Sequence, residues 1–370
     1  MTDTVYIRPI GFAPGPQSEE GDAVRLAGGL VYASRFAVIY RRDGEVVERW
    51  RASPGSIAQV LGQLPDSVAA EAEAQWGNLR MAHPALELGA RTVRLDQPQV
   101  MGILNVTPDS FSDGGKHVGD PAGTREAIGA MVEAGASIID IGGESTRPGA
   151  EAVWEEEEIR RVVPAVEAAA SMGAAVSIDT RRAGTMEAAL KAGAGIVNDV
   201  SALRYDPRSA ELVAKTGCPV VLMHAPGSGN DLHQGGTYES VVFDVFDALR
   251  ERRDAAVAAG IAREKILLDP GLGFGKSLTD NLALINALPL FHALGQPILF
   301  GASRKRMIGA LSKEAAADAR LGGSIALALA AMDAGAQLLR VHDVPETVQA
   351  RDVWRGLRDA ALTDFGDLPG

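Results

Sequence analysis

The chain has 370 residues, a net formal charge of −12 and a sequence pI of about 5.1. Such an acidic chain lacks the basic surface that binding to nucleic-acid phosphates requires, so we expect no nucleic-acid partner; a local basic pocket could still hold a small anion. A single cysteine, Cys218, excludes an internal disulfide, and the sequence has neither a signal-peptide pattern nor an apolar run of about 18 residues. We therefore expect a cytoplasmic protein with no membrane partner.

The first part of the chain differs in pattern from the rest. A segment rich in glycine and proline leads into residues 35–52, where two β-like runs flank Asp43-Gly44. This dipeptide is typical of a tight β-hairpin turn. We predict a small appended α+β module over residues 1–90, and nothing in it suggests a chemical role.

From about residue 98 onward, short apolar runs alternate with helical patterns such as residues 156–171 and 243–259. Ala-Gly-Ala triplets precede three of the runs and are typical of helix ends that lead into a strand. Eight such units in about 260 residues predict a (β/α)8 TIM barrel over residues 98–358 rather than an open Rossmann sheet. The eight runs are 100–104, 137–141, 175–178, 195–197, 219–223, 265–268, 297–300 and 337–341.

Polar side chains follow all eight runs, at the end of the barrel where active sites are built. One such residue is ordinary, since an Asp after a strand is commonly a helix N-cap and an Arg commonly forms a salt bridge. Eight polar strand ends on one rim instead predict a shared site. The candidates are Asn105, Asp109, Arg147, Asp179, Asn198, Met223, Asp269, Ser303, Lys305, Arg340 and His342.

Four of these candidates are cationic or can become so, and they suit a phosphate or diphosphate, because guanidinium groups bind such anions through paired hydrogen bonds. They are Arg147, Lys305, Arg340 and His342. A Mg²⁺ ion held by one or two protein oxygens plus substrate phosphate fits the same rim, with Asn105 or Asp109 as its ligand. No Cys/His cluster in the sequence indicates zinc.

Three further candidates suggest a flat polar ring beside the anion. Asp179, Asn198 and Asp269 come at the ends of apolar strands, where carboxylates and amides must be hydrogen-bonded to be tolerated. An aminopyrimidine-like heterocycle would supply those partners. The sequence therefore predicts a heterocycle at the barrel mouth with a phosphate or diphosphate nearby.

The stretch LDPGLGFGKS, residues 268–277, looks like a phosphate-binding loop but fails on spacing. A P-loop needs a glycine five residues before the glycine of Gly-Lys-Ser, and counting back from Gly275 reaches Pro270. The alternative is a strand that ends at Asp269 and turns away at once through glycines. Phe274, between two glycines, could then lean over a ligand.

Seven motifs in chain order closely resemble those of the dihydropteroate synthase family. They are MGILNVTPDSFSDGG (101–115), IGGESTRPGA (141–150), SIDT (177–180), VNDVSA (197–202), LDPGLGFGKS (268–277), GASRK (301–305) and RVHDV (340–344). The resemblance covers residues 98–358 and leaves out the N-terminal module. It implies a TIM-barrel transferase, usually a homodimer, that joins 6-hydroxymethyl-7,8-dihydropterin diphosphate to 4-aminobenzoate and releases pyrophosphate in folate biosynthesis.

The resemblance also implies roles for individual residues. The pterin ring would be bound by Asp179, Asn198, Asp269, Met223 and Lys305. The diphosphate would be bound by Asn105, which also holds Mg²⁺, and by Arg147, Arg340 and His342. The 4-aminobenzoate would be enclosed by Thr146, Pro148, Phe274 and Ser303, and Gly273 would be a further substrate-binding residue. The loops that carry Asp109, Phe111 and Arg147 would close over the site.

In the mechanism that the resemblance implies, the C–O bond to the diphosphate breaks before the arylamine attacks, and no nucleophilic side chain is needed. The Ser-Thr-Arg-Pro-Gly loop has no insertion, so we expect ordinary sensitivity to sulfonamides. Two alternatives are a pterin-binding barrel of the methyltransferase type and a non-catalytic pterin binder. Both are weaker, because the first has no use for the Ser-Thr-Arg-Pro-Gly, Ser-Arg-Lys and Arg-Val-His motifs and the second should have lost some of them.

Overall fold

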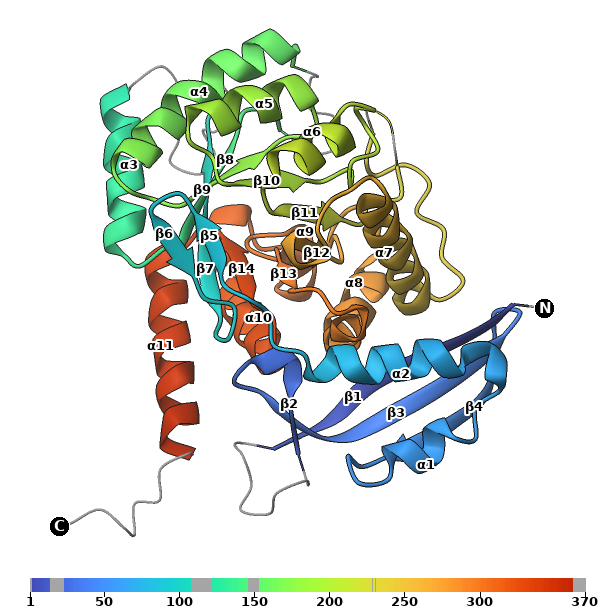
Figure 1. Cartoon of the computed structure of the whole chain (residues 1–370). Helices are drawn as coiled ribbons and strands as arrows, with labels where there is room; N and C mark the ends of the chain where they lie inside the picture. The colour runs from blue at the N-terminus through green and yellow to red at the C-terminus, as the bar shows by residue number, and fades with distance from the viewer. Residues whose placement is uncertain are drawn as a thin grey trace, which may run out of the picture.

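The structure is a computed structural model, and it describes residues 2–13, 23–107, 121–145, 153–227, 229 and 231–361. Its centre is a parallel sheet of eight strands in the order β12-β11-β10-β9-β8-β7-β14-β13 (Figure 1). A parallel bridge between Leu268 and Ile298 joins the two ends of this order, so the sheet closes into the predicted (β/α)8 barrel. The strands are β7 (Gln99–Asn105), β8 (Ile138–Gly142), β9 (Val176–Asp179), β10 (Ile196–Asp199), β11 (Val220–Met223), β12 (Ile266–Asp269), β13 (Leu299–Phe300) and β14 (Leu338–Val341).

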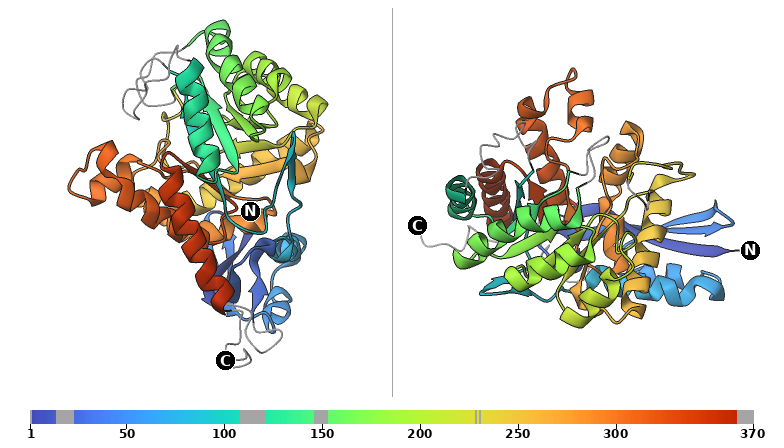
Figure 2. Two further views of the ribbon diagram at one scale, coloured as in Figure 1. Left: turned by 90° about the vertical axis from the view of Figure 1, so that its left-hand side faces the viewer. Right: turned by 90° about the horizontal axis from the view of Figure 1, so that it is seen from above.

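Helices connect the strands and form the outer layer of the barrel (Figures 1 and 2). The predicted Ala-Gly-Ala helix ends are confirmed: Gly135, Gly193 and Gly335 have φ values of 98°, 115° and 87°, which favour glycine. The helices are α3 (Pro121–Glu133), α4 (Glu155–Ser171), α5 (Ala183–Ala192), α6 (Ser209–Thr216), α7 (Val241–Ala258), α8 (Leu278–Asn286), α9 (Arg306–Leu311), α10 (Leu321–Asp333) and α11 (Val344–Ala361).

The N-terminal elements form a small antiparallel sheet with two helices. The sheet contains β1 (Asp3–Ala13), β2 (Val24–Arg25), β3 (Tyr32–Arg42) and β4 (Glu45–Ala52), and the helices are α1 (Ile57–Leu61) and α2 (Asp66–Arg80). The hairpin predicted around Asp43-Gly44 is confirmed, with β3 paired to β4 and φ values of 49° and 85° at the two turn residues. Positive φ at both positions is what a two-residue hairpin turn requires.

A second hairpin closes the bottom of the barrel. Strands β5 (Leu86–Leu88) and β6 (Arg91–Val93) pair with each other, and their buried side chains cluster with residues near the start of the barrel strands. That cluster contains Leu86, Leu88, Val93, Leu95, Met101, Ile138, Ala175, Ile196, Val221, Leu267, Leu299 and Leu338. Because the amino-terminal ends of the strands are sealed in this way, the opposite, carboxyl ends carry the site.

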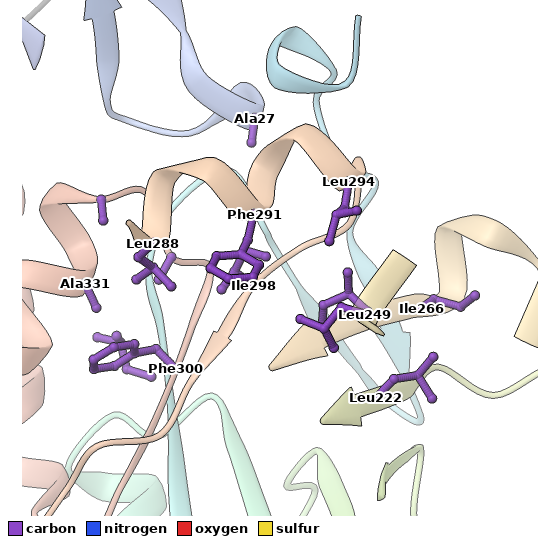
Figure 3. Packing of buried hydrophobic residues seen from close by; sticks show 14 of the residues in the cluster. Ala27, Leu222, Leu249, Ile266, Leu288, Phe291, Leu294, Ile298, Phe300 and Ala331 are labelled. Carbon is purple, nitrogen blue, oxygen red and sulfur yellow. The ribbon is translucent and has the colours of Figure 1, made fainter. Parts of the chain in front are cut away.

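The N-terminal sheet shares one hydrophobic core with the barrel. Tyr6 of β1 packs against Phe243 of α7, with ring centroids 4.4 Å apart, and its hydroxyl donates to Asp247 at 2.7 Å. Ala27 lies beside the 3-10 helix η4 (Leu288–Leu294), whose Phe291 is fully buried (Figure 3). The division of the chain into residues 1–90 and 98–358 stays a prediction, because apolar side chains of the N-terminal sheet and of the barrel are buried in one hydrophobic core.

In the part of the chain that the structure describes, no helix combines the length and apolarity needed to cross a bilayer.

Two histidines, one just after α2 and one in η4, lead us to predict that the folded protein loses stability in acid. Burial lowers the pKa of His83 to about 3 and that of His292 to about 4, whereas an unfolded histidine titrates near pH 6.5. The unfolded chain therefore binds more protons than the folded one below pH 6.5. For His292, which is 1% exposed, we expect the free energy of unfolding to fall by about 1.4 kcal/mol per pH unit between pH 6.5 and about 4.

The variant His292→Gln isolates this contribution, because glutamine can still donate to the carbonyl of Ala334 but cannot titrate. Urea unfolding at several pH values should give a shallower acid slope for the variant than for the wild type. Parallel slopes would show that His292 does not titrate in this range.

Candidate active site

The polar strand ends predicted from the sequence meet at the carboxyl rim of the barrel. Asn105 is in register with Gly142, and Gly142 with Asp179, so the first and third strand ends face each other across a glycine. A Cβ added at Gly142 would lie 3.7 Å from Oδ1 of Asn105 and 3.5 Å from Cβ of Asp179. Gly301 separates Arg340 from Asp269 in a similar way. Glycine at these two positions leaves the mouth of the barrel open.

A buried ion-pair network occupies the centre of this mouth. Arg340 donates through Nε to Oδ2 of Asp140 at 2.6 Å and through Nη2 to Oδ2 of Asp179 at 2.7 Å. Asn198 donates from Nδ2 to the same Asp140 oxygen at 3.2 Å. One guanidinium group and one amide therefore connect strands β8, β9, β10 and β14.

Asp140 is the residue of this network that the sequence analysis missed. It lies inside the apolar run Ile138–Gly142, is fully buried, and its Oδ1 has no hydrogen-bond partner among the described residues. The neighbouring Ser177 in the register of β9 also has a buried hydroxyl to which none of the described groups hydrogen-bonds. The available signal was the charge itself, because an Asp in the middle of an apolar strand must have a buried cation or ligand to satisfy it.

The electrostatics of the rim follow from this burial. Burial raises the pKa of Asp179 despite its pairing with Arg340, and it also raises the pKa of Asp269. Burial lowers the pKa of Lys305 to about 8, while the nearby Asp269 carboxylate opposes that change. Carboxylates and cations thus face one another in a poorly solvated space, where a polar ligand interacts more strongly than in water.

Asp269 is fixed by the turn that follows it. Its Oδ1 accepts a hydrogen bond from the amide of Gly271 at 2.7 Å, and its carbonyl oxygen accepts from the amide of His224 at 2.9 Å. Gly271 has a φ of 67°, and a Cβ added there would lie 1.8 Å from the carbonyl oxygen of His224. Only glycine fits this position. Met223, at the end of β11, is buried beside this turn.

Phe274 lies in the loop after β12 and is held on its ring faces by two polar side chains. The imidazole of His233 stacks on it, with centroids 5.1 Å apart and planes 12° apart. The ammonium of Lys305 lies 4.9 Å from the ring centroid and also donates to the carbonyl of Leu272. A Cβ added at the exposed Gly273 would lie 3.2 Å from Cδ of Lys305, so the loop passes directly over this lysine.

Ser303 and His342 are brought together from the last two strand ends. The Ser303 hydroxyl lies 3.1 Å from Nδ1 of His342 and accepts from the His342 amide at 3.2 Å. Next to them, Arg304 and Asp343 form an ion pair. The two predicted residues therefore form one polar wall of the site.

A second charged network, also missed from the sequence, underlies the loop after β8. Glu144 pairs with Arg182 at 2.9 Å and with Arg181 at 3.2 Å, and Arg182 pairs with the buried Glu158 at 2.7 Å. The guanidinium of Arg181 also lies 4.2 Å from the ring centroid of Tyr205. The Glu of IGGES lies 37 and 38 residues before the two arginines that follow SIDT, so no local pattern in the sequence revealed their pairing.

The structure thus brings together Asn105, Asp179, Asn198, Met223, Asp269, Gly273, Phe274, Ser303, Lys305, Arg340 and His342 on one rim. Five predicted site residues lie outside the described residues: Asp109, Phe111, Thr146, Arg147 and Pro148. Among the described side chains, no group of three or more His, Cys, Asp or Glu could hold a metal ion.

The Asp140 network generates a prediction for the variant Asp140→Asn. The variant keeps the shape of the side chain but removes the charge that the guanidinium of Arg340 pairs with, so we expect Arg340 to lose its fixed orientation. Turnover should fall by about tenfold or more, while the far-ultraviolet circular dichroism spectrum stays that of the wild type. A control at the half-buried Asp96→Asn, whose carboxylate pairs with Arg94, should leave turnover unchanged. Full activity of Asp140→Asn would remove the network from the site.

Comparison with known proteins identifies the chain's relatives. Residues 101–342 match the family of pterin binding enzymes. The dihydropteroate synthase of Escherichia coli K12 is 47% identical over 260 residues, which cover 70% of this chain and 91% of that protein.

Two solved structures are also similar. One is Xanthomonas albilineans dihydropteroate synthase with 4-aminobenzoic acid, which has a TM-score of 0.69 and 47% identity and covers 78% of this chain and 100% of that one. The other is Yersinia pestis dihydropteroate synthase in complex with a sulfonamide drug, with a TM-score of 0.70 and 45% identity over 74% of this chain and 99% of that one. The strand-end motifs, the closed barrel and these similarities together show that this chain belongs to the pterin binding enzymes, within the dihydropteroate synthases.

Proposed function

We propose that this chain condenses 6-hydroxymethyl-7,8-dihydropterin diphosphate with 4-aminobenzoate to give 7,8-dihydropteroate and pyrophosphate. The observation that carries the proposal is the Asp140–Arg340–Asp179 network, with Asn198 and Asp269 beside it, at the mouth of a barrel of this family. The similar Xanthomonas albilineans enzyme was solved with 4-aminobenzoic acid, one of the two substrates. A transferase of this kind needs small-molecule substrates and no protein nucleophile.

The pterin ring is assigned to the buried polar strand ends. Asp179, Asn198 and Asp269 are mostly or fully buried and can accept from or donate to the amino and ring nitrogen groups of a pterin. Met223 supplies an apolar surface next to Asp269, and Lys305 lies between Asp269 and Phe274. These groups would recognise the ring by forming with it the hydrogen bonds that it forms with water in solution.

The diphosphate is assigned to Asn105, Arg340 and His342, together with Arg147. Asn105 ends β7 and presents a neutral oxygen near Asp179. With no cage of acidic ligands among the described residues, this rim fits a Mg²⁺ ion that is shared with the substrate's own phosphate oxygens. When bound through Asn105, Mg²⁺ would neutralise charge on the departing pyrophosphate.

The second substrate, 4-aminobenzoate, is assigned to the opposite wall, formed by Ser303, Gly273 and Phe274 with Thr146 and Pro148. Phe274 is already oriented by the stacked His233 and by the ammonium of Lys305. A planar aromatic acid packs well against such a ring. By the same assignment, an aromatic sulfonamide that resembles 4-aminobenzoate would compete for this wall, so ordinary sulfonamide sensitivity is expected.

In the proposed mechanism the bond between the methylene carbon and the diphosphate oxygen breaks first. Arg340 and His342 stabilise the charge that develops on the pyrophosphate, while the bound pterin delocalises the positive charge on the methylene group. The amine nitrogen of 4-aminobenzoate then forms a bond to that carbon and releases a proton. The side chains position and stabilise the reactants, and the loops after β7 and β8 would exclude water.

We also propose a homodimer in the cytoplasm. The single cysteine, Cys218, suits a reducing compartment. Val353 and Leu357, four residues apart on α11, are exposed apolar side chains of the kind that a second copy could cover.

The variant Asp269→Asn tests the assignment of the pterin ring. It keeps an acceptor oxygen for the amide of Gly271 but replaces the charged oxygen that would face the ring, so the affinity for pterin diphosphate should fall by about tenfold or more. Isothermal calorimetry with pterin diphosphate, and thermal unfolding as a check on the fold, measure this. Unchanged affinity would place the ring elsewhere.

The variant Arg340→Ala tests the reaction itself. The wild type should release pyrophosphate only when Mg²⁺, pterin diphosphate and 4-aminobenzoate are all present, and Arg340→Ala should lower that rate by about 10²-fold or more. The exposed Arg306→Ala, after the same barrel rim, is a matched control that should keep the wild-type rate. Pyrophosphate release without any formation of 7,8-dihydropteroate, in the presence of both substrates, would contradict the proposed condensation.

A further inference from the structure

Lys276, the lysine of the Gly-Lys-Ser sequence whose spacing does not fit a P-loop, makes a set of contacts that the proposed reaction does not use. Its Nζ lies 2.8 Å from the carbonyl oxygen of Gly271, 3.2 Å from that of Phe274 and 3.3 Å from that of His224. It also lies 3.0 Å from Nδ1 of His224. An ammonium has only donors, so all four contacts are donor-to-acceptor contacts from one side chain.

These contacts join two loops of the rim. Gly271 and Phe274 belong to the loop after β12, and His224 follows β11. The amide of Phe274 donates to the carbonyl of Gly271 at 3.2 Å, so Lys276 contacts the carbonyls at both ends of a single turn. Asp269 lies two residues before this turn, and its carbonyl accepts from the amide of His224. Lys276 therefore lies behind the turn that connects Asp269 to Phe274.

The protonation of the groups around Lys276 is compatible with hydrogen bonds donated by its Nζ. Burial, together with Lys276 and Arg204, lowers the pKa of His224 to about 3, so its ring is neutral and its Nδ1 can accept. Burial lowers the pKa of Lys276 itself to about 7, and Asp269 opposes that change. Since buried carbonyl oxygens without partners are costly, the lysine is retained in this position by the acceptors that it satisfies.

The neighbouring helix does not depend on Lys276. Helix α8 begins with a capping box in which the Ser277 hydroxyl accepts from the amide of Asp280 at 3.1 Å and the Asp280 carboxylate accepts from the Ser277 amide at 2.9 Å. Asn281 separately binds the Gly273 amide through its Oδ1 at 2.6 Å. Lys276 thus binds the carbonyls of the turn, while the capping box starts the helix. This separation allows the two roles to be tested independently.

We propose that Lys276 is a positioning residue for the second substrate, because it fixes the Gly271–Phe274 turn and thereby the Phe274 ring that forms one wall of the 4-aminobenzoate site. The inference rests on the proposed function of that wall. Without the ammonium the turn loses donors to the carbonyls of Gly271 and Phe274, and the ring loses its set position over the site. Asp269 keeps its bonds to the amide of Gly271 and, through its carbonyl, to that of His224, so the pterin side should be largely unaffected.

The test compares Lys276→Met, which keeps the length of the side chain but removes its donors, with Ser277→Ala, which breaks the adjacent capping box. For Lys276→Met, KM for 4-aminobenzoate should rise by about tenfold to a hundredfold, because a displacement of about 1 Å at a binding wall has effects of that size. The dissociation constant for pterin diphosphate should stay within about twofold of the wild type. Ser277→Ala should lower the melting temperature but leave both values unchanged.

Three results would overturn the proposal. One is an unchanged KM for 4-aminobenzoate in folded Lys276→Met, and the second is an equal loss of affinity for both substrates, which would mark a general structural role. If Lys276→Met does not fold, Lys276→Gln, which retains a shorter amide donor, takes its place. An unchanged KM for 4-aminobenzoate in Lys276→Gln is then the third result.

The variant Phe274→Ala separates this proposal from the proposed function. If Phe274→Ala raises KM for 4-aminobenzoate and Lys276→Met does not, Lys276 does not position the ring. If Phe274→Ala leaves KM unchanged in an active enzyme, the wall itself is assigned wrongly and the proposal falls with it. If the wild type releases no pyrophosphate with both substrates present, the proposed function is wrong.

Discussion

The arrangement of the barrel mouth depends on one interaction, the pairing of Arg340 with Asp140 and Asp179. A buried carboxylate is tolerated only with a partner, and Asp140 is fully buried. The guanidinium of Arg340 supplies that partner for two carboxylates at once, through Nε and Nη2. In doing so it links strands β8, β9 and β14, and it keeps a strong cation at the position where the diphosphate is expected.

The elements around this network have different roles at the two ends of the barrel. At the amino-terminal ends of the strands, the β5–β6 hairpin fills the barrel interior with apolar side chains, while η4, Tyr6 and Ala27 belong to a second hydrophobic cluster. At the carboxyl ends, glycines at 142 and 301 keep space for a ligand. The rigid lower half allows the upper half to retain buried charges, which cost stability but orient the chemistry.

The turn after β12 shows how such orientation is achieved beyond the residues that would contact substrate. Gly271 admits the close approach of the His224 carbonyl, Lys276 binds the carbonyls of the turn, and His233 stacks on Phe274. None of these interactions needs a phosphate. The glycines and the lysine of this stretch are explained by close packing of two loops, although together they resemble a nucleotide-binding motif.

Much of the fold, and the position of the described polar strand ends on one rim, could be predicted from the sequence, because both depend on signals between near neighbours. Apolar runs at regular spacing predicted all eight strands, Asp43-Gly44 predicted the hairpin turn, and the polar residue after each run predicted the rim. The partners of those residues could not be predicted in this way. Arg340 and Asp140 are separated by 200 residues, and Tyr6 and Asp247 by 241.

What the sequence determined by itself is therefore the series of strands, helices and turns and the set of polar groups at the rim. Only the tertiary structure decided that Arg340 faces two carboxylates, that Lys276 binds backbone carbonyls rather than phosphate, and that the N-terminal sheet is buried against η4. The physical reason is that local periodicity and turn preference act along the chain. Whether a side chain is buried depends instead on where closure of the barrel places it. The partner with which it pairs depends on the same placement.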